Sequence, residues 1–163
     1  MNGHLIDKKK ILESLIEKLN NELVEVSGAA KSARDLATAD DLKSEGKYDT
    51  RAIEASYLAS AQNKRVEEIK LDIQMLEDLQ TQIDKSTKLQ LGSLGLISCN
   101  GQARLYFLSS TSGGSMIMID GNPILVISVF SPIGDAALGL GPGESFEVET
   151  PKETRSYDVL EVY

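Results

Sequence analysis

The sequence predicts an α+β protein, in which a long antiparallel α-helical coiled-coil hairpin precedes a mostly antiparallel β domain with one short helix. Two observations predict this fold class. Apolar residues recur every three or four positions over most of residues 7–85, which is the spacing of a helix face. After residue 86, short apolar or alternating runs are separated by Gly, Ser, Asn and Pro, as in strands and turns. We therefore expect residues 1–86 to form the hairpin and residues 87–163 to form the β domain.

Two helices of similar length are expected, from Asp7 to Thr38 and from Asp49 to Lys85. Leu and Ile predominate near their shared base and Ala toward their far ends, so the two backbones can approach closely in the distal half. The predicted seam consists of Leu12, Leu15, Leu19, Leu23, Val26, Ala30, Ala33 and Ala37 on the first helix, and of Ala55, Ala59, Val66, Ile69, Ile73, Leu76 and Ile83 on the second. A slim two-helix hairpin follows from this pattern.

The connection between the helices, residues 40–49, becomes the tip of the hairpin and carries four carboxylates and two lysines. One interpretation is that this charged tip reaches a deep site in a partner. The other is that its polar residues only begin the second helix. In that case Ser44 is the N-cap and Glu45 complements the helix dipole in the first turn, with Asp40 or Asp41 as alternative caps. The spacing of these residues alone does not decide between the two interpretations.

Six strands are expected in the second half of the chain, together with a turn at residues 120–123 and a short capped helix within residues 131–139. The predicted strands are Leu94–Ser98, Ala103–Leu108, Ser115–Asp120, Ile124–Val129, Ser145–Thr150 and Tyr157–Val162. A segment of this size is long enough for a modest core of its own.

Composition excludes several function classes. The 163 residues carry a net charge of −8, whereas sequence-specific binding to duplex DNA needs clustered cations. The chain contains one cysteine, Cys99, so an internal disulfide is impossible. No apolar run approaches the roughly 18 to 20 residues that cross a bilayer. We expect a cytoplasmic protein that contacts no membrane.

Several isolated motifs carry little functional signal. His4 lies near the start of the chain without other potential metal ligands, and Cys99 lacks a neighbouring base in the sequence. The Ser- and Gly-rich run 109–115 lacks the Gly-Lys-Ser/Thr ending of a phosphate loop. Lysines 8–10 either contact RNA or solvate the start of the first helix.

The residues of the second half carry a family resemblance. The matching motifs are Ser131-Pro132, Ala137-Leu138-Gly139, Gly143-Glu144, Phe146-Glu147-Val148, Tyr157 and Val159-Leu160-Glu161-Val162. Their order and spacing resemble the FKBP-like domain of the Gre family of bacterial transcription elongation factors (GreA and GreB). The first half of the chain is similar to the N-terminal helical hairpin of that family's proteins, with Asp41-Leu42 and Tyr48 at its tip and Arg51 one turn further on. Together these matches cover nearly the whole chain.

The resemblance implies a mechanism in which the partner is RNA polymerase. The C-terminal domain would dock on the rim of the secondary channel, on the largest subunit, and the hairpin would enter the channel. The docking residues implied in this way are Ser131, Pro132, Ile133, Gly134, Ala137, Leu138 and Gly139. Tip residues Asp40, Asp41, Ser44, Glu45 and Tyr48 would act at the polymerase active site. There Asp41 and Glu45 would share a Mg²⁺ ion of the polymerase while the nascent RNA 3′ end is hydrolysed. Such a site suits Mg²⁺, which prefers a few carboxylates together with water and phosphate oxygens as ligands.

The tip departs from the family pattern, which reads Asp-Leu-Ser-Glu-Asn-Ala-Glu-Tyr or nearly so. Here Ser44 stands where the second carboxylate is expected, and Glu45 is displaced by one position, about 100° around a helix. Lys43 adjoins Asp41, and Lys47 replaces another acid. A lysine beside a carboxylate favours its ionised form but competes with a metal for it. A factor that binds in the channel and inhibits without stimulating cleavage is therefore an alternative.

The chain is not expected to be an enzyme; at most it stimulates the polymerase's own transcript cleavage, and it has no cofactor of its own. Two functions of other classes remain open. A peptidyl-prolyl isomerase needs an aromatic-lined pocket, for which the chain offers Phe107, Phe130, Phe146 and a few tyrosines. A hairpin adaptor would oligomerise through its seam.

Overall fold

The computed structural model describes residues 6–38 and 50–163, without the side chains of Ala37, Thr38 and Arg51. The predicted tip, residues 40–49, and His4 lie outside the described residues. By their contacts the residues fall into two compact units, one of residues 1–16 with 75–163 and one of residues 17–74. The base of the hairpin belongs to the same unit as the sheet, and the domain boundary at residue 86 stays a prediction.

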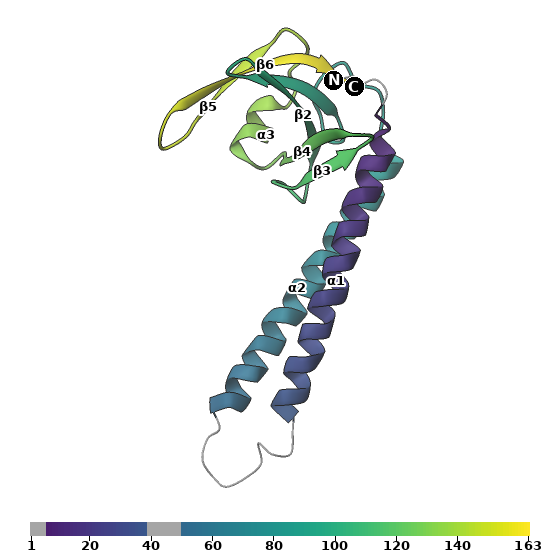
Figure 1. Cartoon of the computed structure of the whole chain (residues 1–163), viewed down its shortest axis with the longest axis vertical. Coiled ribbons are helices and arrows are strands. Elements are labelled where there is room, and N and C mark those ends of the chain that lie inside the picture. Colours follow the sequence, from purple (N-terminus) through teal and green to yellow (C-terminus); the bar gives the residue numbers. More distant parts are fainter. Residues whose placement is uncertain (1–5, 39–49) are drawn as a thin grey trace. The chain divides into compact units, whose positions relative to one another are not determined.

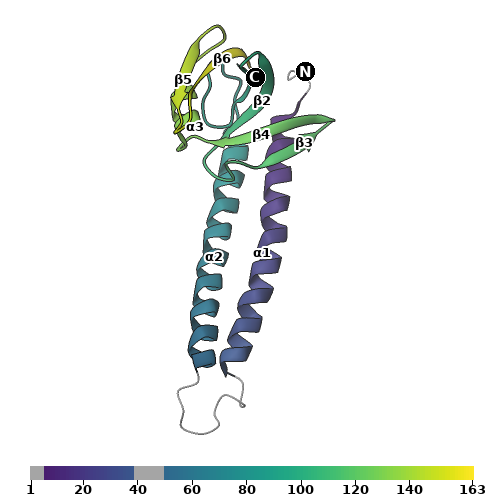
Figure 2. The same cartoon turned by 60° about the vertical axis from the view of Figure 1, so that its left-hand side comes forward.

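Two long helices form the first part of the chain, α1 (Lys8–Thr38, 31 residues) and α2 (Thr50–Thr81, 32 residues). They lie side by side and run in opposite directions (Figures 1 and 2). Asp7 caps α1, since its Oδ1 accepts a hydrogen bond from the Lys9 N–H at 2.9 Å. The predicted extension of α2 to Lys85 is wrong. A bond from the Gln82 N–H to the Leu79 carbonyl at 3.0 Å tightens the last turn.

The predicted seam is confirmed for the described side chains within α1 and α2, whereas Ile83 lies beyond the end of α2. Its buried members are Leu12, Leu15, Leu19, Ala30, Ala33, Ala59, Ile69 and Leu76. The other described members are half-buried. In the distal half the buried seam residues are alanines, which agrees with the predicted close approach of the two backbones.

An ion pair between Arg65 and Glu22 joins α2 to α1. Arg65 Nη2 and Nε both donate to Glu22 Oε1, at 2.6 and 3.0 Å. The hydrogen bond with Glu22 raises the pKa of Arg65 above its ordinary value. Because both side chains are partly exposed, we expect this pair to contribute no more than about 1 kcal/mol.

A six-stranded sheet in the order β3-β4-β2-β1-β6-β5 forms the second part of the described chain. Its strands are β1 (Leu94–Cys99), β2 (Gln102–Ser109), β3 (Met116–Ile119), β4 (Asn122–Ser128), β5 (Ser145–Glu149) and β6 (Thr154–Val162), with the helix α3 (Pro132–Ala137) between β4 and β5. The predicted α+β fold class, a helical hairpin followed by a sheet with one short helix, is confirmed.

The sheet is mostly antiparallel, as predicted, and contains one parallel pair. Four neighbouring pairs are antiparallel, but β2 and β4 are parallel, with Leu105 opposite Ile124. After β2 the chain passes to the edge of the sheet, forms β3 there, and returns as β4 between β3 and β2. Short turns predict only the antiparallel hairpins, so this crossing was not foreseen.

Two turns are built from residues with positive φ. Asn100 and Gly101 connect β1 to β2 with φ of 53° and 78°, and Asp120 and Gly121 connect β3 to β4 with φ of 48° and 81°. Asn-Gly and Asp-Gly are the sequences that favour such two-residue hairpin turns. The predicted turn at residues 120–123 is therefore confirmed, although β4 already begins at Asn122.

The sheet is buried on both faces. One face, partly covered by α3, carries a core cluster of Leu89, Ile97, Tyr106, Leu108, Ile127, Ala137, Phe146, Tyr157 and Val159. The alternate residues, including Leu94, Leu105, Phe107, Ile124 and Val126, are also fully buried. The first turns of α1 belong to the same unit and contribute the fully buried Ile11 and Leu12. Since adjacent helical residues point about 100° apart, the base of α1 is covered on two sides.

Candidate functional site

The turn before α3 is held by Ser131, one of the predicted docking residues. Its Oγ accepts a hydrogen bond from the Gly134 N–H at 3.1 Å and donates one to the Ser128 carbonyl at 2.6 Å. Pro132 follows at the start of α3, where its missing N–H costs nothing and its fixed φ suits a helix. The Ser-Pro pair thus fixes the point at which the chain leaves β4 and enters α3.

Gly134 and Ala137 lie on the buried side of this segment. A Cβ placed on Gly134 would lie 1.9 Å from the Ser128 carbonyl oxygen and 2.9 Å from Val129 Cα. The helix therefore packs directly on the end of β4. Two of the seven predicted docking residues, Gly134 and Ala137, are therefore buried and do not contribute to the outer surface of the segment.

Exposed members of the predicted segment are Pro132, Leu138 and Gly139, while Ile133 is half-buried against the core cluster. Gly139 has φ of 83°, a conformation that favours glycine, and its N–H donates to the Leu89 carbonyl at 2.8 Å. Next to them lies Phe130, whose side chain is 81% exposed. We name Phe130, Pro132 and Leu138 the apolar rim.

Sequence reasoning did not select Phe130 for this surface. The signal that could have pointed to it was its place in the sequence. Phe130 is a bulky aromatic residue that directly precedes Ser131, the N-cap of α3. Two of the three phenylalanines, Phe107 and Phe146, are instead buried in the sheet. These three residues therefore do not line one proline pocket, which weakens the isomerase interpretation.

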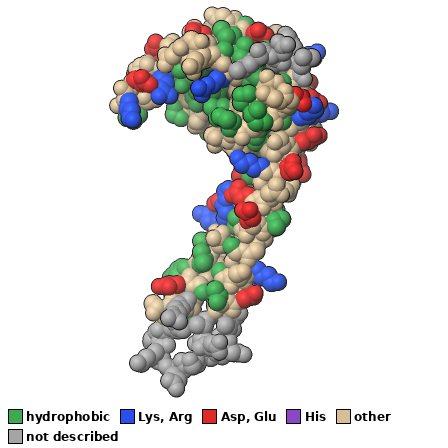
Figure 3. Space-filling view, viewed as in Figure 1, with side chains coloured by type: hydrophobic (Ala, Val, Ile, Leu, Met, Phe, Trp, Pro, Cys, Tyr) green, Lys and Arg blue, Asp and Glu red, His purple; other side chains and the backbone are tan. Residues whose placement is uncertain are grey.

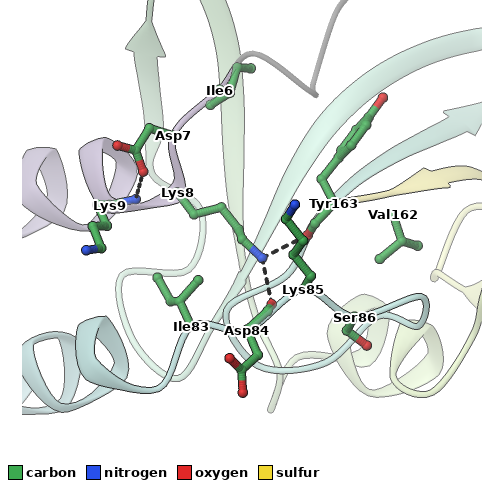
Figure 4. A pocket seen from close by; sticks show the side chains of 10 residues that line it. All are labelled: Ile6, Asp7, Lys8, Lys9, Ile83, Asp84, Lys85, Ser86, Val162 and Tyr163. Carbon is green, nitrogen blue, oxygen red and sulfur yellow. Dashed lines mark hydrogen bonds between the residues drawn. The ribbon is translucent and has the colours of Figure 1, made fainter.

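A second feature lies at the base of the hairpin, where residues from α1, the segment after α2 and the end of β6 line a cavity of about 440 Å³ (Figure 4). Lys8 Nζ donates to the main-chain carbonyls of Asp84 and Tyr163, each at 3.0 Å. Burial lowers the pKa of Lys8, and the Asp84 carboxylate partly opposes this shift. With its amine directed at two carbonyls, Lys8 is a structural contact that ties three chain segments together. This contact favours neither of the two interpretations of lysines 8–10.

A pair of stacked rings occupies the face of the sheet that α3 partly covers. Phe146 on β5 and Tyr157 on β6 have ring centroids 5.0 Å apart and nearly parallel planes. Tyr106 on β2 belongs to the same core cluster. Burial raises the pKa of both Tyr106 and Tyr157 above the ordinary 10.0, so both phenols stay protonated at neutral pH.

These raised pKa values predict a loss of stability in alkali. A folded pKa above the unfolded pKa contributes stability that is present below about pH 10 and lost as the pH rises through the folded value. We expect the free energy of unfolding, measured with urea, to fall between pH 9 and 11, and to fall less in Tyr157→Phe than in the unchanged protein. Tyr57→Phe is the control, because Tyr57 is exposed on α2. Equal losses in both variants would refute the assignment.

The predicted tip residues Asp40, Asp41, Ser44, Glu45 and Tyr48 lie outside the described residues. Whether Asp41 and Glu45 could share a Mg²⁺ ion therefore stays a prediction. Among the residues that the structure describes, no three His, Cys, Asp or Glu side chains come together as a possible metal site. Within the same described ranges, no helix has the length and apolar character needed to span a membrane.

Comparison with known proteins identifies relatives of the whole chain. Residues 119–163 match the family model described as transcription elongation factor GreA/GreB, C-terminal. The transcription elongation factor GreA of Christiangramia forsetii is 30% identical over 156 residues, which are 95% of this chain and 91% of that protein. The GreA of Flavobacterium johnsoniae is 29% identical over 153 residues, which are 90% of this chain and 91% of that protein.

Solved structures give a weaker likeness. Thermus aquaticus Gfh1 is 22% identical, with 94% of this chain and 92% of that chain covered and a TM-score of 0.38. A transcription elongation factor GreA/GreB from Nitrosomonas europaea is 19% identical, with 53% of this chain and 74% of that chain covered and a TM-score of 0.36.

Proposed function

Since the chain belongs to the GreA/GreB family of transcription elongation factors, we propose that it binds bacterial RNA polymerase and modulates elongation from the secondary channel. The observation that carries this proposal is the extent of the match, which spans 95% of the chain and so includes both the helices and the sheet. The chain acts in the cytoplasm, has no catalytic activity of its own, and reaches the RNA 3′ end only through the polymerase.

The length and narrowness of the two helices support the proposal that the hairpin carries residues 40–49 into the channel. At about 1.5 Å per residue, each is roughly 46 to 48 Å long. The buried Ala30, Ala33 and Ala59 keep the distal part narrow. A narrow pair of helices of this length suits a channel, and it presents residues 40–49 where the two helices are joined.

Docking is assigned to the apolar rim. Aromatic side chains that become buried at an interface contribute much of its binding energy, and Phe130 is 81% exposed in the free chain. Its backbone is fixed, because the Phe130 N–H donates to Ser128 Oγ at 3.2 Å and Ser131 closes the same turn. An exposed aromatic on a rigid support loses little conformational freedom when a partner covers it.

The composition of the tip decides what the bound factor does. Asp41 is retained from the family pattern, whereas Ser44 lacks the carboxylate expected there and Lys43 and Lys47 add positive charge. We therefore expect weak stimulation of transcript cleavage by the unchanged protein. The alternative of the same class is inhibition without cleavage.

Transcript cleavage by stalled RNA polymerase tests this assignment. Ser44→Glu restores the missing carboxylate and is expected to raise the cleavage rate about tenfold or more, since removing a single electrostatic contribution at an active site typically costs that much or more. Asp41→Ala is expected to lower cleavage while binding is unchanged.

Ser60→Glu, which adds the same charge on an exposed position of α2, is the matched control. Equal cleavage rates for Ser44→Glu and Ser60→Glu would contradict the proposed action of the tip. Inhibition by the unchanged protein at equal binding would select the alternative.

A second candidate function is a hairpin adaptor. Its predicted pairing surface, the seam, is largely buried within the chain, so such an adaptor would pair through other side chains of the helices. Several large apolar side chains on the helices are exposed, among them Val24, Leu36, Tyr57 and Leu58, and Figure 3 shows hydrophobic patches between the charged groups there. Such side chains can pair with a second copy of the chain. Sedimentation that shows a dimer, together with no contact with polymerase, would favour this function.

A further inference from the structure

A polar pocket of about 360 Å³ opens beside the β1–β2 turn. Its walls come from two strands that flank β1 in the sheet order. Arg104 and Tyr106 alternate along β2, and Arg155 and Tyr157 alternate along β6, so each pair lies on one face of its strand. Tyr106 and Tyr157 share one core cluster, against which Cys99 of β1 also packs. The two arginines are therefore on the same face of the sheet, on either side of β1.

Their spacing suits convergence on one small group. Strands lie about 4.8 Å apart, so β2 and β6 are separated by roughly 10 Å. The intervening strand ends at Cys99, and the turn at Asn100-Gly101 follows. Two long guanidinium side chains can thus reach over the end of β1 from opposite sides.

The charge of the pocket is opposite to that of the chain. Its lining holds Arg104 and Arg155 against one described carboxylate, Glu153, whereas the whole chain carries −8. Glu153 Oε1 accepts a hydrogen bond from Arg155 Nε at 2.7 Å. Arg104 makes a long contact of 3.4 Å with Gln102 Oε1. A positive hollow in an acidic protein is a local arrangement, not a consequence of composition.

The floor of the pocket supplies neutral donors in fixed positions. Tyr106 and Tyr157 are 5% and 7% exposed. Phenols are protonated at neutral pH, and burial raises the pKa values of these two further above the ordinary 10.0. The stacking of Tyr157 on Phe146 holds its ring in place. Protonated phenols donate hydrogen bonds. The Tyr157 phenol is already hydrogen-bonded to Arg155 and Cys99 and so links that guanidinium to the floor, whereas Tyr106 adds a further donor.

We propose that this pocket binds the oxyanion of a small ligand, either a phosphate monoester or a carboxylate, between Arg104 and Arg155. Guanidinium groups present paired N–H donors that match both oxyanions. A volume of about 360 Å³ lies at the small end of ligand pockets, which favours a small molecule over a protein surface. The pocket shares no residue with the apolar rim, so the proposal goes beyond the polymerase-binding function and does not depend on it.

Titration of the intact chain with inorganic phosphate and, separately, with acetate tests the proposal. The readout is the ¹H–¹⁵N NMR signals of the arginine Nε–H groups. Saturable shifts of the Arg104 and Arg155 signals are expected with at least one probe, and the probe that saturates identifies the oxyanion. Arg104→Gln and Arg155→Gln should each weaken binding about tenfold.

Two further variants separate a site from general charge. Lys152→Gln removes a cation that lies between β5 and β6 and does not line the pocket. It should change the affinity by less than about twofold. Glu153→Gln removes the competing carboxylate and should strengthen binding severalfold. No saturation with either probe, or equal weakening by Arg155→Gln and Lys152→Gln, would overturn the proposal.

Discussion

Gly134→Ala is expected to lower the free energy of unfolding by about 3 kcal/mol or more, at the upper end of the cost of overpacking. The added methyl group would lie 1.9 Å from the Ser128 carbonyl oxygen. That oxygen cannot move freely, because it accepts hydrogen bonds from Ser131 Oγ at 2.6 Å and from the Ser131 N–H at 3.0 Å. Relief of the clash would displace α3 from β4 and break the Ser131 cap. Chemical denaturation followed by far-ultraviolet circular dichroism measures the loss.

Gly28→Ala is the matched control for this substitution. Gly28 lies inside α1, and nothing lies within 4 Å of the position its Cβ would take. Alanine in a helix interior is favoured over glycine by about 1 kcal/mol, so this variant should be more stable than the unchanged protein. If Gly134→Ala left the free energy of unfolding unchanged or raised it, as expected for Gly28→Ala, the close approach of α3 to β4 would be refuted.

Phe130→Ala is expected to weaken binding to RNA polymerase by about tenfold or more, which corresponds to the 1.4 kcal/mol or more that a central aromatic contributes. Because Phe130 is 81% exposed, its removal should leave the free energy of unfolding within about 0.5 kcal/mol. Fluorescence anisotropy of the labelled chain, titrated with core polymerase, measures the affinity.

Leu160→Ala serves as the control for loss of an exposed apolar side chain. Leu160 is 43% exposed on β6 and lies outside the apolar rim. Its substitution should leave the affinity within about twofold. A normal affinity in Phe130→Ala would remove the apolar rim from the docking surface, even if the chain itself binds polymerase.

The helices and their seam could be predicted because their signal is local and repeated. A period of three and four positions fixed the buried side of α1 and α2, from Leu12 to Ala33 and from Ala59 to Leu76. The Asp120-Gly121 turn was predictable for the same reason, since its backbone conformation depends on two residues.

Features that depend on distant parts of the chain could not be predicted. The parallel pairing of β2 with β4 follows from where β3 lies in the sheet, which no short motif specifies. Lys8 contacts carbonyls 76 and 155 positions away. The same limit applies to Gly134, whose burial depends on the position of Ser128, although the family resemblance implied that it belongs to a docking segment.

Cross-linking from the tip of the hairpin tests the central claim most directly. A photo-reactive amino acid in place of Ser44 would be incorporated into the full chain, which is then mixed with a stalled polymerase complex at micromolar concentration and irradiated. The proposed function predicts cross-links to the polymerase around its active centre and to the RNA 3′ end. Cross-links confined to a second copy of the chain, or no cross-link to polymerase, would contradict it.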